Sequence, residues 1–383
     1  MQKIKILSVF GTRPEAIKMA PLVKVLSASA LVDSLVCITA QHREMLDSVL
    51  DVFGIIPNYD LDIMTKNQDL ASITTKALNG IMDVLADARP DFVLVHGDTT
   101  TTMAASLAAF YAKIPLGHVE AGLRTHEKYA PFPEEINRRI VGVCADIHFA
   151  PTQTARDNIR SEGEWGDRIF ITGNTEIDAA ANLTRKSYNF NEKRLNELDF
   201  KGKRIITMTA HRRENHGKPL EDICHAVLRI AQDFKDVHVV YPVHPSPVVQ
   251  STAHKILGDQ SGILLTNPLD VQDLHNLMAR SYLVLTDSGG LQEGAAYHNV
   301  PVVVLRNVTE RPEGIDAGCL VLGGNEENSV YNAASKLLLD EAAHKAMSEA
   351  KNPFGDGLAS QRILGNILYF FGKSCQRPDE FEA

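Results

Sequence analysis

The hydrophobic positions of this chain fall into short apolar runs separated by longer amphipathic stretches. Short runs without polar alternation are typical of buried parallel strands, and the amphipathic stretches between them are typical of covering helices. In the first half they predict strands at Ile4–Phe10, Leu35–Thr39, Phe92–His96, Leu116–Val119, Ile147–Ala150 and Arg168–Thr172, with helices around Leu70–Leu85 and Thr100–Ala112. This alternation predicts a doubly wound α/β domain.

A second series of the same kind begins near Arg204, after the polar segment Leu183–Gly202. It predicts strands at Ile205–Thr209, Val237–Tyr241, Ile263–Thr266, Tyr282–Thr286 and Val302–Leu305, with helices near Leu220–Phe234, Asp270–Ala279 and Leu291–Tyr297. We therefore expect an α/β protein of two doubly wound, Rossmann-like domains facing a central cleft. The expected domains are 1–172 and 173–357; a last helix at about 358–372 could pack back on the first, and the tail Gln376–Ala383 should be solvated.

Composition narrows the class of protein. A chain of 383 residues exceeds one typical core, and a net charge of -9 disfavours nonspecific nucleic-acid binding. The five cysteines are scattered without a C-x-x-C pair, as in a reducing compartment. No signal-peptide core and no run of about 20 apolar residues occurs. We expect a cytoplasmic protein that binds neither nucleic acid nor membrane.

Acidic side chains follow two of the predicted strands. His96-Gly97-Asp98 ends one, and His118-Val119-Glu120 ends the next. Ligands of open α/β sheets bind at the carboxyl ends of the strands. Since Glu134 and Glu135 follow close behind, these carboxylates together predict acid–base chemistry.

A metal centre is the alternative interpretation of the same segment. His96, Asp98, His118, Glu120 and His126 have suitable donor atoms. However, no H-x-x-x-H helix and no dense Asp/His loop supports such ligands. We therefore expect no metal.

Two strand-to-helix junctions have the composition of anion sites. Gly11-Thr12-Arg13-Pro14-Glu15 opens a helix, with Thr12 as its cap and Arg13 as a fork of donors, while Lys18 lies one turn further on. Ser288-Gly289-Gly290 offers a hydroxyl and two amides at a helix start, and Glu293 could accept hydrogen bonds from a sugar. In both places an ordinary turn is the alternative. Neither matches G-x-G-x-x-G or a P-loop.

Two further segments carry candidate residues. His211, at the end of the first strand of the second domain, could stay protonated near a diphosphate and act on a leaving group. The alternative is a surface run paired with Glu214. Gln41-His42-Arg43 ends the second strand of the first domain and could border the cleft, although Arg43 could simply pair with Asp47.

The order of these motifs resembles the non-hydrolysing UDP-N-acetylglucosamine 2-epimerases, which have a glycosyltransferase-B-like fold of two domains. The resemblance extends almost end to end and rests on Phe10–Pro21, Ala40–Leu46, Val95–Thr102, Gly117–Arg124, Pro133–Arg138, Ile171–Asp178, Thr209–Asn215, Thr286–Glu293 and Glu310–Glu313. Phe132 stands where many members have Trp, and Leu274 where many have Phe near the uracil. Gly294–His298 also departs from the usual sequence.

The resemblance implies reversible epimerisation at C2 of UDP-N-acetylglucosamine (UDP-GlcNAc) to UDP-N-acetylmannosamine (UDP-ManNAc). UDP leaves by elimination across C1 and C2, and then adds back to the bound 2-acetamidoglucal. No cofactor is needed, and a homodimer that uses a UDP-sugar substrate is expected. The implied catalytic residues are Asp98, Glu120, Glu134 and His211. The diphosphate would be held by Arg13, Ser288, Gly289 and Gly290, and the residues near uridine would be Lys18, Leu274 and Glu293. Further contributions to substrate binding could come from Gln41, His42 and Arg43.

Three rival functions remain open at this point. A hydrolysing epimerase would share the elimination step but release N-acetylmannosamine and UDP. A glycosyltransferase with the same fold would need an acceptor site, and three carboxylates are more than it requires. A nucleotide-sugar sensor would bind without turnover, which Asp98, Glu120 and Glu134 disfavour.

Overall fold

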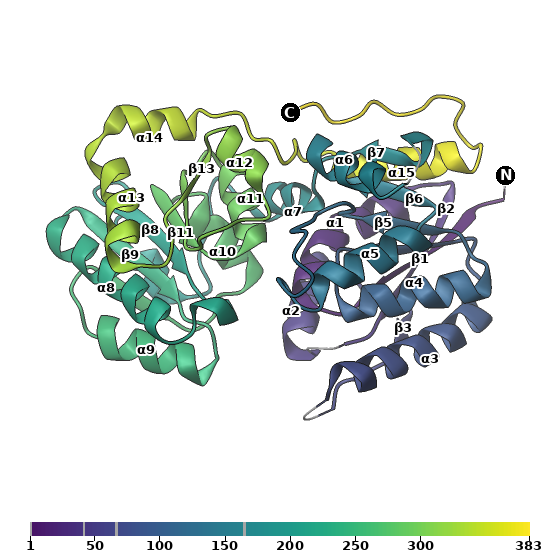
Figure 1. Cartoon of the computed structure of the whole chain (residues 1–383), viewed down its shortest axis with the longest axis horizontal. Coiled ribbons are helices and arrows are strands. Elements are labelled where there is room, and N and C mark those ends of the chain that lie inside the picture. Colours follow the sequence, from purple (N-terminus) through teal and green to yellow (C-terminus); the bar gives the residue numbers. More distant parts are fainter. Residues whose placement is uncertain (1, 41–42, 66–67, 164–165) are drawn as a thin grey trace. The chain divides into compact units, whose positions relative to one another are not determined.

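The computed structural model describes residues 2–40, 43–65, 68–163 and 166–383 (Figure 1). The chain divides into unit 1, formed by Met1–Asn182 and Gly355–Ala383, and unit 2, formed by Leu183–Phe354. Unit 1 thus extends past residue 172 through most of helix α7 (Thr175–Leu183) and includes the last helix, α15 (Ala359–Phe370). No helix in the described part of the chain has the length and apolar character that crossing a membrane requires.

Unit 1 is built on a seven-stranded parallel sheet with the order β3-β2-β1-β4-β5-β6-β7. Its strands are β1 (Ile4–Phe10), β2 (Val32–Ile38), β3 (Tyr59–Asp60), β4 (Phe92–His96), β5 (Leu116–Val119), β6 (Ile147–Ala150) and β7 (Ile169–Ile171). The helices between them are α1 (Arg13–Ala28), α2 (Arg43–Phe53), α3 (Leu70–Ala88), α4 (Thr100–Ala112), α5 (Glu134–Cys144) and α6 (Gln153–Ser161).

Strand alternation assigns the helices of unit 1 to the two faces of the sheet. Val93 and Val95 belong to a buried cluster with α3, α4 and α5. Phe92, which points to the opposite face, contacts the rings of Phe370 and Phe371 at the end of α15 with centroid distances of 6.0 and 5.7 Å. Because α15 also packs against α1, these two helices cover that face.

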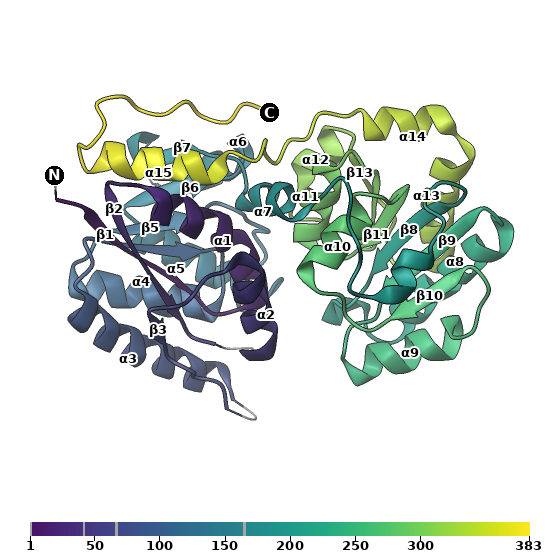
Figure 2. The same ribbon diagram turned by 180° about the vertical axis from the view of Figure 1, so that it is seen from behind.

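Unit 2 has a six-stranded parallel sheet with the order β10-β9-β8-β11-β12-β13. Its strands are β8 (Arg204–Thr209), β9 (Val237–Pro242), β10 (Ile263–Thr266), β11 (Leu283–Thr286), β12 (Val302–Val304) and β13 (Leu320–Leu322). Its helices are α8 (Lys218–Asp233), α9 (Pro247–Leu257), α10 (Val271–Met278), α11 (Gly289–Tyr297), α12 (Pro312–Asp316), α13 (Glu327–Leu339) and α14 (Glu341–Ser348), seen from two sides in Figures 1 and 2.

The two faces of the second sheet also bury separate clusters. Ile206 packs with α8, α9 and α13, while its neighbour Ile205 packs with Leu277 of α10 and with Phe190. Both units are therefore parallel α/β layers, which confirms the predicted fold class. In a parallel sheet the carboxyl ends of all strands lie at the same edge, and the candidate residues lie at this edge.

The C-terminal tail differs from its prediction. The amide of Phe381 donates to the carbonyl of Ile171 in β7 (2.9 Å), and Glu380 accepts from Arg156 (2.7 Å). Phe381 is 8% exposed. The expectation of a solvated tail was wrong for Glu380 and Phe381, because β7 is an edge strand whose free polar groups and apolar face take them up. Most other residues of the tail are exposed, as expected.

Candidate active site

Glu15 joins the loops that follow β1 and β4 in unit 1. Its Oε2 accepts from the amides of Gly11 (3.0 Å) and Thr12 (2.7 Å), which completes the capping box at the start of α1. Its Oε1 accepts from the hydroxyls of Thr99 (2.7 Å) and Thr102 (3.0 Å) at the start of α4. The two junctions therefore form one connected edge of the sheet.

Glu120 follows β5 and is held by a cation. Its two carboxylate oxygens accept from Lys18 Nζ at 2.7 and 2.8 Å, although the two residues are far apart in the chain. His96 Nε2 lies 3.0 Å from Oε2, and Asn174 donates to Oε1 at 3.4 Å. Glu120 has a φ of 60°, in the left-handed region that non-glycine residues rarely adopt. Such a strained and buried carboxylate is a feature of functional sites.

Asp98 follows the neighbouring strand, β4. Its Oδ2 accepts from Arg138 Nε (2.8 Å) and Nη2 (2.7 Å), and its carbonyl accepts from Asn137 (2.8 Å). The side chain keeps 26% of its surface exposed. Since His96 of β4 pairs with Val119 of β5, Asp98 and Glu120 follow adjacent strands at the same edge.

Helix α5 brings the remaining acidic residues of unit 1. Glu134 is its first residue and is half-buried, whereas Glu135 is fully buried. Glu135 accepts from the amides of Thr125 (3.0 Å) and His126 (3.1 Å) and from Arg138 Nη1 (3.2 Å). Burial raises the pKa of Glu135, but these amides and Arg138 outweigh burial and lower it overall.

The histidines of this edge are engaged with protein groups. His118 Nε2 lies 2.7 Å from the carbonyl of Gly97, and burial lowers the pKa of His118 to about 3 and that of His148 to about 4. His96 faces Glu120. Among the residues that the structure describes, no group of three or more His, Cys, Asp and Glu side chains is arranged to hold a metal ion.

In unit 2, Asp287 organises the loop that carries His211. Its Oδ2 accepts from the amides of His211 and Arg212, both at 2.8 Å, and from Asn215 Nδ2 at 3.0 Å. Asp287 is fully buried at the end of β11. The loop after β8 is thereby fixed to the loop after β11, next to Ser288.

His211 stacks on His244, with ring centroids 5.3 Å apart and planes inclined by 12°. Burial lowers the pKa of His211, as do the charges of Arg212 and His216, while Asp287 opposes them. The net shift is downward. Without a ligand the neutral imidazole is therefore favoured at neutral pH, and protonation of His211 beside a diphosphate stays a prediction.

The start of α11 is packed against an arginine. A Cβ atom at Gly289 would lie 2.6 Å from Arg311 Cζ, so a larger residue here would have to displace the guanidinium. Arg311 Nε donates to Glu293 Oε1 (2.7 Å), and Glu293 is 1% exposed. Glu310 pairs with Arg311 (2.9 Å) and Arg306 (2.6 Å), and these arginines together with Arg212 outweigh burial and hold its pKa far below its usual range.

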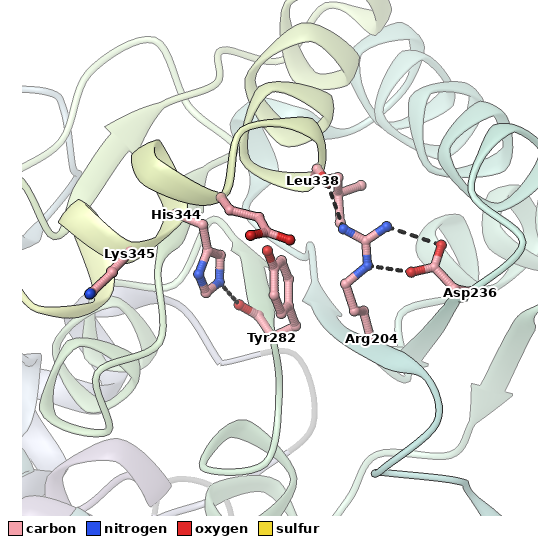
Figure 3. Close-up of a pocket in the computed structure, with 7 residues that line it drawn as sticks. Arg204, Asp236, Tyr282, Leu338, His344 and Lys345 are labelled. Carbon is pink, nitrogen blue, oxygen red and sulfur yellow. Dashed lines mark hydrogen bonds and ion pairs between the residues drawn. The ribbon is translucent and has the colours of Figure 1, made fainter.

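A cavity of about 610 Å³ in unit 2 lies at the other edge of the sheet (Figure 3). Arg204 begins β8, and Tyr282 directly precedes β11. Arg204 donates to both oxygens of Asp236 at 2.5 and 3.0 Å, and His344 Nε2 lies 2.8 Å from the Tyr282 carbonyl. These polar groups bind one another, so the carboxyl edge remains the better candidate for chemistry.

Comparison with known proteins assigns the chain. A family model described as UDP-N-acetylglucosamine 2-epimerase matches residues 24–368. The chain belongs to the UDP-N-acetylglucosamine 2-epimerase family. It is 53% identical to the enzyme of that name from Bacillus subtilis, over 100% of this chain and 99% of the relative. The Escherichia coli K12 enzyme is 49% identical over 94% and 97% of the two chains.

Two solved structures of epimerases carry ligands. S. aureus MnaA with UDP is 51% identical, has a TM-score of 0.93, and covers 99% of this chain and 100% of its own. The Neisseria meningitidis epimerase bound to UDP-GlcNAc is 43% identical, with a TM-score of 0.89, and covers 96% of this chain and 100% of its own. The glycosyltransferase-B-like fold and the assignment to isomerases of the non-hydrolysing type follow from this relationship.

Several binding residues predicted for an epimerase lie in unexpected surroundings. Lys18, expected near uridine, is 7% exposed and lies on Glu120. Glu293 Oε1 accepts from Arg311 Nε, and its contact with the ribose stays a prediction. Arg43 is exposed and pairs with Asp47 (3.1 Å), Asp60 (2.6 Å) and Asp62 (3.4 Å), so the surface ion pair named as its alternative is present.

The binding roles of Leu274 and Arg13 stay predictions. Leu274 is half-buried beside the Phe190 cluster. Arg13 is the first residue of α1 and is half-buried. Gln41 and His42 lie outside the described residues.

Sequence reasoning missed the residues that hold the carboxylates. Arg138 binds Asp98, Asp287 binds the His211 loop, and Arg311 fills the space over Gly289. The signal for Arg138 was its spacing, since Glu135 and Arg138 are three residues apart on one helix. No local signal marks the partners of Asp287 or Lys18, which are distant in the sequence.

Proposed function

We propose that this protein interconverts UDP-GlcNAc and UDP-ManNAc by elimination and re-addition of UDP, with Asp98, Glu120, Glu134 and His211 as its catalytic residues. The observation that carries the proposal is the pair of carboxylates after β4 and β5, each fixed by a cation, in a chain that is 53% identical to a named epimerase over its full length. Known relatives have been solved with UDP and with UDP-GlcNAc. We propose UDP-GlcNAc as the substrate here.

The reaction needs one group to remove the C2 proton and another to return a proton to the opposite face of that carbon. The C1–O bond breaks as the C2 proton leaves, a C1–C2 double bond forms, and UDP carries away the bonding electrons. Re-addition of UDP reverses these changes with the opposite configuration at C2. Asp98, Glu120 and Glu134 supply carboxylates for the proton transfers, which typically contribute a factor of about 10²–10⁴ each.

Departure of UDP needs compensation of the charge that develops on the diphosphate. We propose that Arg13, the amides of Gly289 and Gly290, the Ser288 hydroxyl and His211 provide it. Glu293, whose Oε1 holds Arg311 over Gly289, would also accept hydrogen bonds from the ribose. A bound diphosphate would raise the pKa of His211 and favour its protonated form. A cytoplasmic location, a homodimer and the absence of a cofactor remain predictions.

Proton NMR of the purified chain with UDP-GlcNAc in deuterated water tests the proposal. The expected result is growth of UDP-ManNAc signals with deuterium at C2 in both sugars, because the C2 proton is exchanged during elimination. No metal or cofactor is added. Free N-acetylmannosamine with UDP would instead identify a hydrolysing enzyme, and an unchanged spectrum would favour a transferase or a sensor.

Replacing His211 by alanine should weaken UDP binding about 10- to 100-fold, because one hydrogen bond to a charged group is worth about 1.5–3 kcal/mol and each 1.4 kcal/mol is a factor of about ten. Turnover should fall as well, because the same group compensates the leaving diphosphate. Isothermal titration calorimetry with UDP measures the affinity. His225→Ala, an exposed histidine on α8, is the control and should bind normally. Full UDP affinity in His211→Ala would refute this placement.

A further inference from the structure

Glu135 is a fully buried charge next to a candidate catalytic residue. It follows Glu134 on α5, but consecutive helix residues point in different directions, so the two carboxylates contact different parts of the protein. Glu135 is 0% exposed and accepts from two backbone amides, those of Thr125 (3.0 Å) and His126 (3.1 Å). A carboxylate that is buried this completely does not reach a substrate directly.

Arg138 connects Glu135 to Asp98. Its Nη1 donates to Glu135 Oε2 (3.2 Å), while Nε and Nη2 donate to Asp98 Oδ2 (2.8 and 2.7 Å). A guanidinium is planar and rigid, so fixing one side of it fixes the direction of its other donors. Arg138 is 5% exposed. Its orientation is therefore set by protein groups rather than by water.

The geometry points to a positioning role for Glu135 in the epimerase reaction. We propose that Glu135 orients Arg138, and that Arg138 in turn fixes the Asp98 carboxylate in its reactive position. This role rests on the proposed function. Glu135 also links Asp98 to the loop at Thr125 and His126, because one carboxylate holds both the loop amides and the arginine.

The charges around Glu135 support an ionised carboxylate. Arg138 is the near cation, and Arg139 Nη2 lies 3.9 Å from Oε1 with 48% of its side chain exposed. A glutamine at position 135 has one acceptor oxygen in place of two, so it cannot satisfy both amides and Arg138. Thr125 and Arg138 both donate to Oε2, whereas His126 donates to Oε1, so the NH2 group of a glutamine must face a donor in either orientation. In both orientations the charge that pairs with Arg138 is lost.

The test compares Glu135→Gln with the unmodified chain in steady-state epimerisation of UDP-GlcNAc. We expect kcat to fall about 10- to 100-fold, because a misplacement of about 1 Å costs up to 10²-fold in rate. KM and the affinity for UDP should change less than about twofold. A purely structural role would lower the amount of active protein, which active-site titration with UDP corrects, without changing kcat per site.

Glu162→Gln is the matched control. Glu162 binds Arg124, whose side chain is 1% exposed, at 2.7 and 2.8 Å, which makes it a second buried-arginine pair next to the same loop. It has no contact with Asp98 among the described interactions. Glu162 also lies 3.9 Å from the exposed Arg139, which faces Glu135 at the same distance. The kcat of Glu162→Gln should nevertheless stay within about twofold of the unmodified chain, because the contacts of Arg138 with Glu135 and Asp98 are kept.

Three outcomes would overturn the role of Glu135. These are an unchanged kcat in Glu135→Gln, an equal loss of kcat in Glu162→Gln, and a loss confined to KM. If Glu135→Gln does not fold, Arg138→Lys decides, since it keeps the charge but removes the fork. It should show the same loss of kcat, and normal kcat would refute the proposal. Absence of turnover in the unmodified chain would refute the proposed function itself.

Discussion

Asp98→Asn should strongly reduce epimerisation while leaving UDP affinity within about twofold. The side chains have the same shape, so the loop keeps its packing, but asparagine cannot accept or return a proton. The expected fall in kcat is about 10²–10⁴-fold. Deuterium should also fail to enter C2 in the NMR experiment. Calorimetry with UDP measures the affinity, which depends on groups other than Asp98.

Asp236→Asn provides the control for this substitution. Asp236 is also an aspartate held by two nitrogens of an arginine, Nε and Nη2 of Arg204, but it lies at the opposite edge of the unit 2 sheet. It should retain full turnover. Normal turnover in Asp98→Asn would remove Asp98 from the mechanism, whereas loss of UDP binding would assign it to the substrate rather than to proton transfer.

The sheet was predictable wherever a strand is an uninterrupted apolar run. Phe92–His96 and Ile147–Ala150 have the predicted bounds because each is buried on both faces. The sequence did not predict β3 (Tyr59–Asp60) or β13 (Leu320–Leu322), which are short edge strands. Their pairing depends on the neighbouring strand more than on their own sequence.

The site was predictable as far as strand ends determine it. Asp98 and Glu120 follow buried strands, so local pattern placed them at the carboxyl edge; their catalytic roles stay predictions. The contacts of Lys18 could not be predicted, because Glu120 is 102 positions away in the chain. The same holds for Glu293, whose direction depends on Arg311 from the segment after β12. Long-range ion pairs of this kind follow from tertiary packing and produce no periodic pattern in the sequence.

Lys18→Met should be the most destabilising single change at this edge. It leaves the Glu120 carboxylate, 8% exposed, without its nearest cation. Removing one partner of a buried ion pair costs about 3–5 kcal/mol of the free energy of unfolding, because the remaining charge is uncompensated. His96 and Asn174 also contact Glu120 and should offset part of that cost. Urea denaturation, followed by a signal from unit 1, measures the loss in the free energy of unfolding. Turnover should be lost as well.

Two further variants separate stability from chemistry. Lys24→Met removes an exposed lysine of the same helix and should cost less than about 1 kcal/mol. In the double variant Lys18→Met with Glu120→Met no buried charge is left unpaired, and such replacements are often neutral or stabilising. It should regain most of the stability lost in Lys18→Met and yet remain inactive. If the double variant regains turnover as well as stability, Glu120 has no role in the reaction. If Lys18→Met is as stable as the unmodified chain, the other neighbours of Glu120 compensate its charge without Lys18.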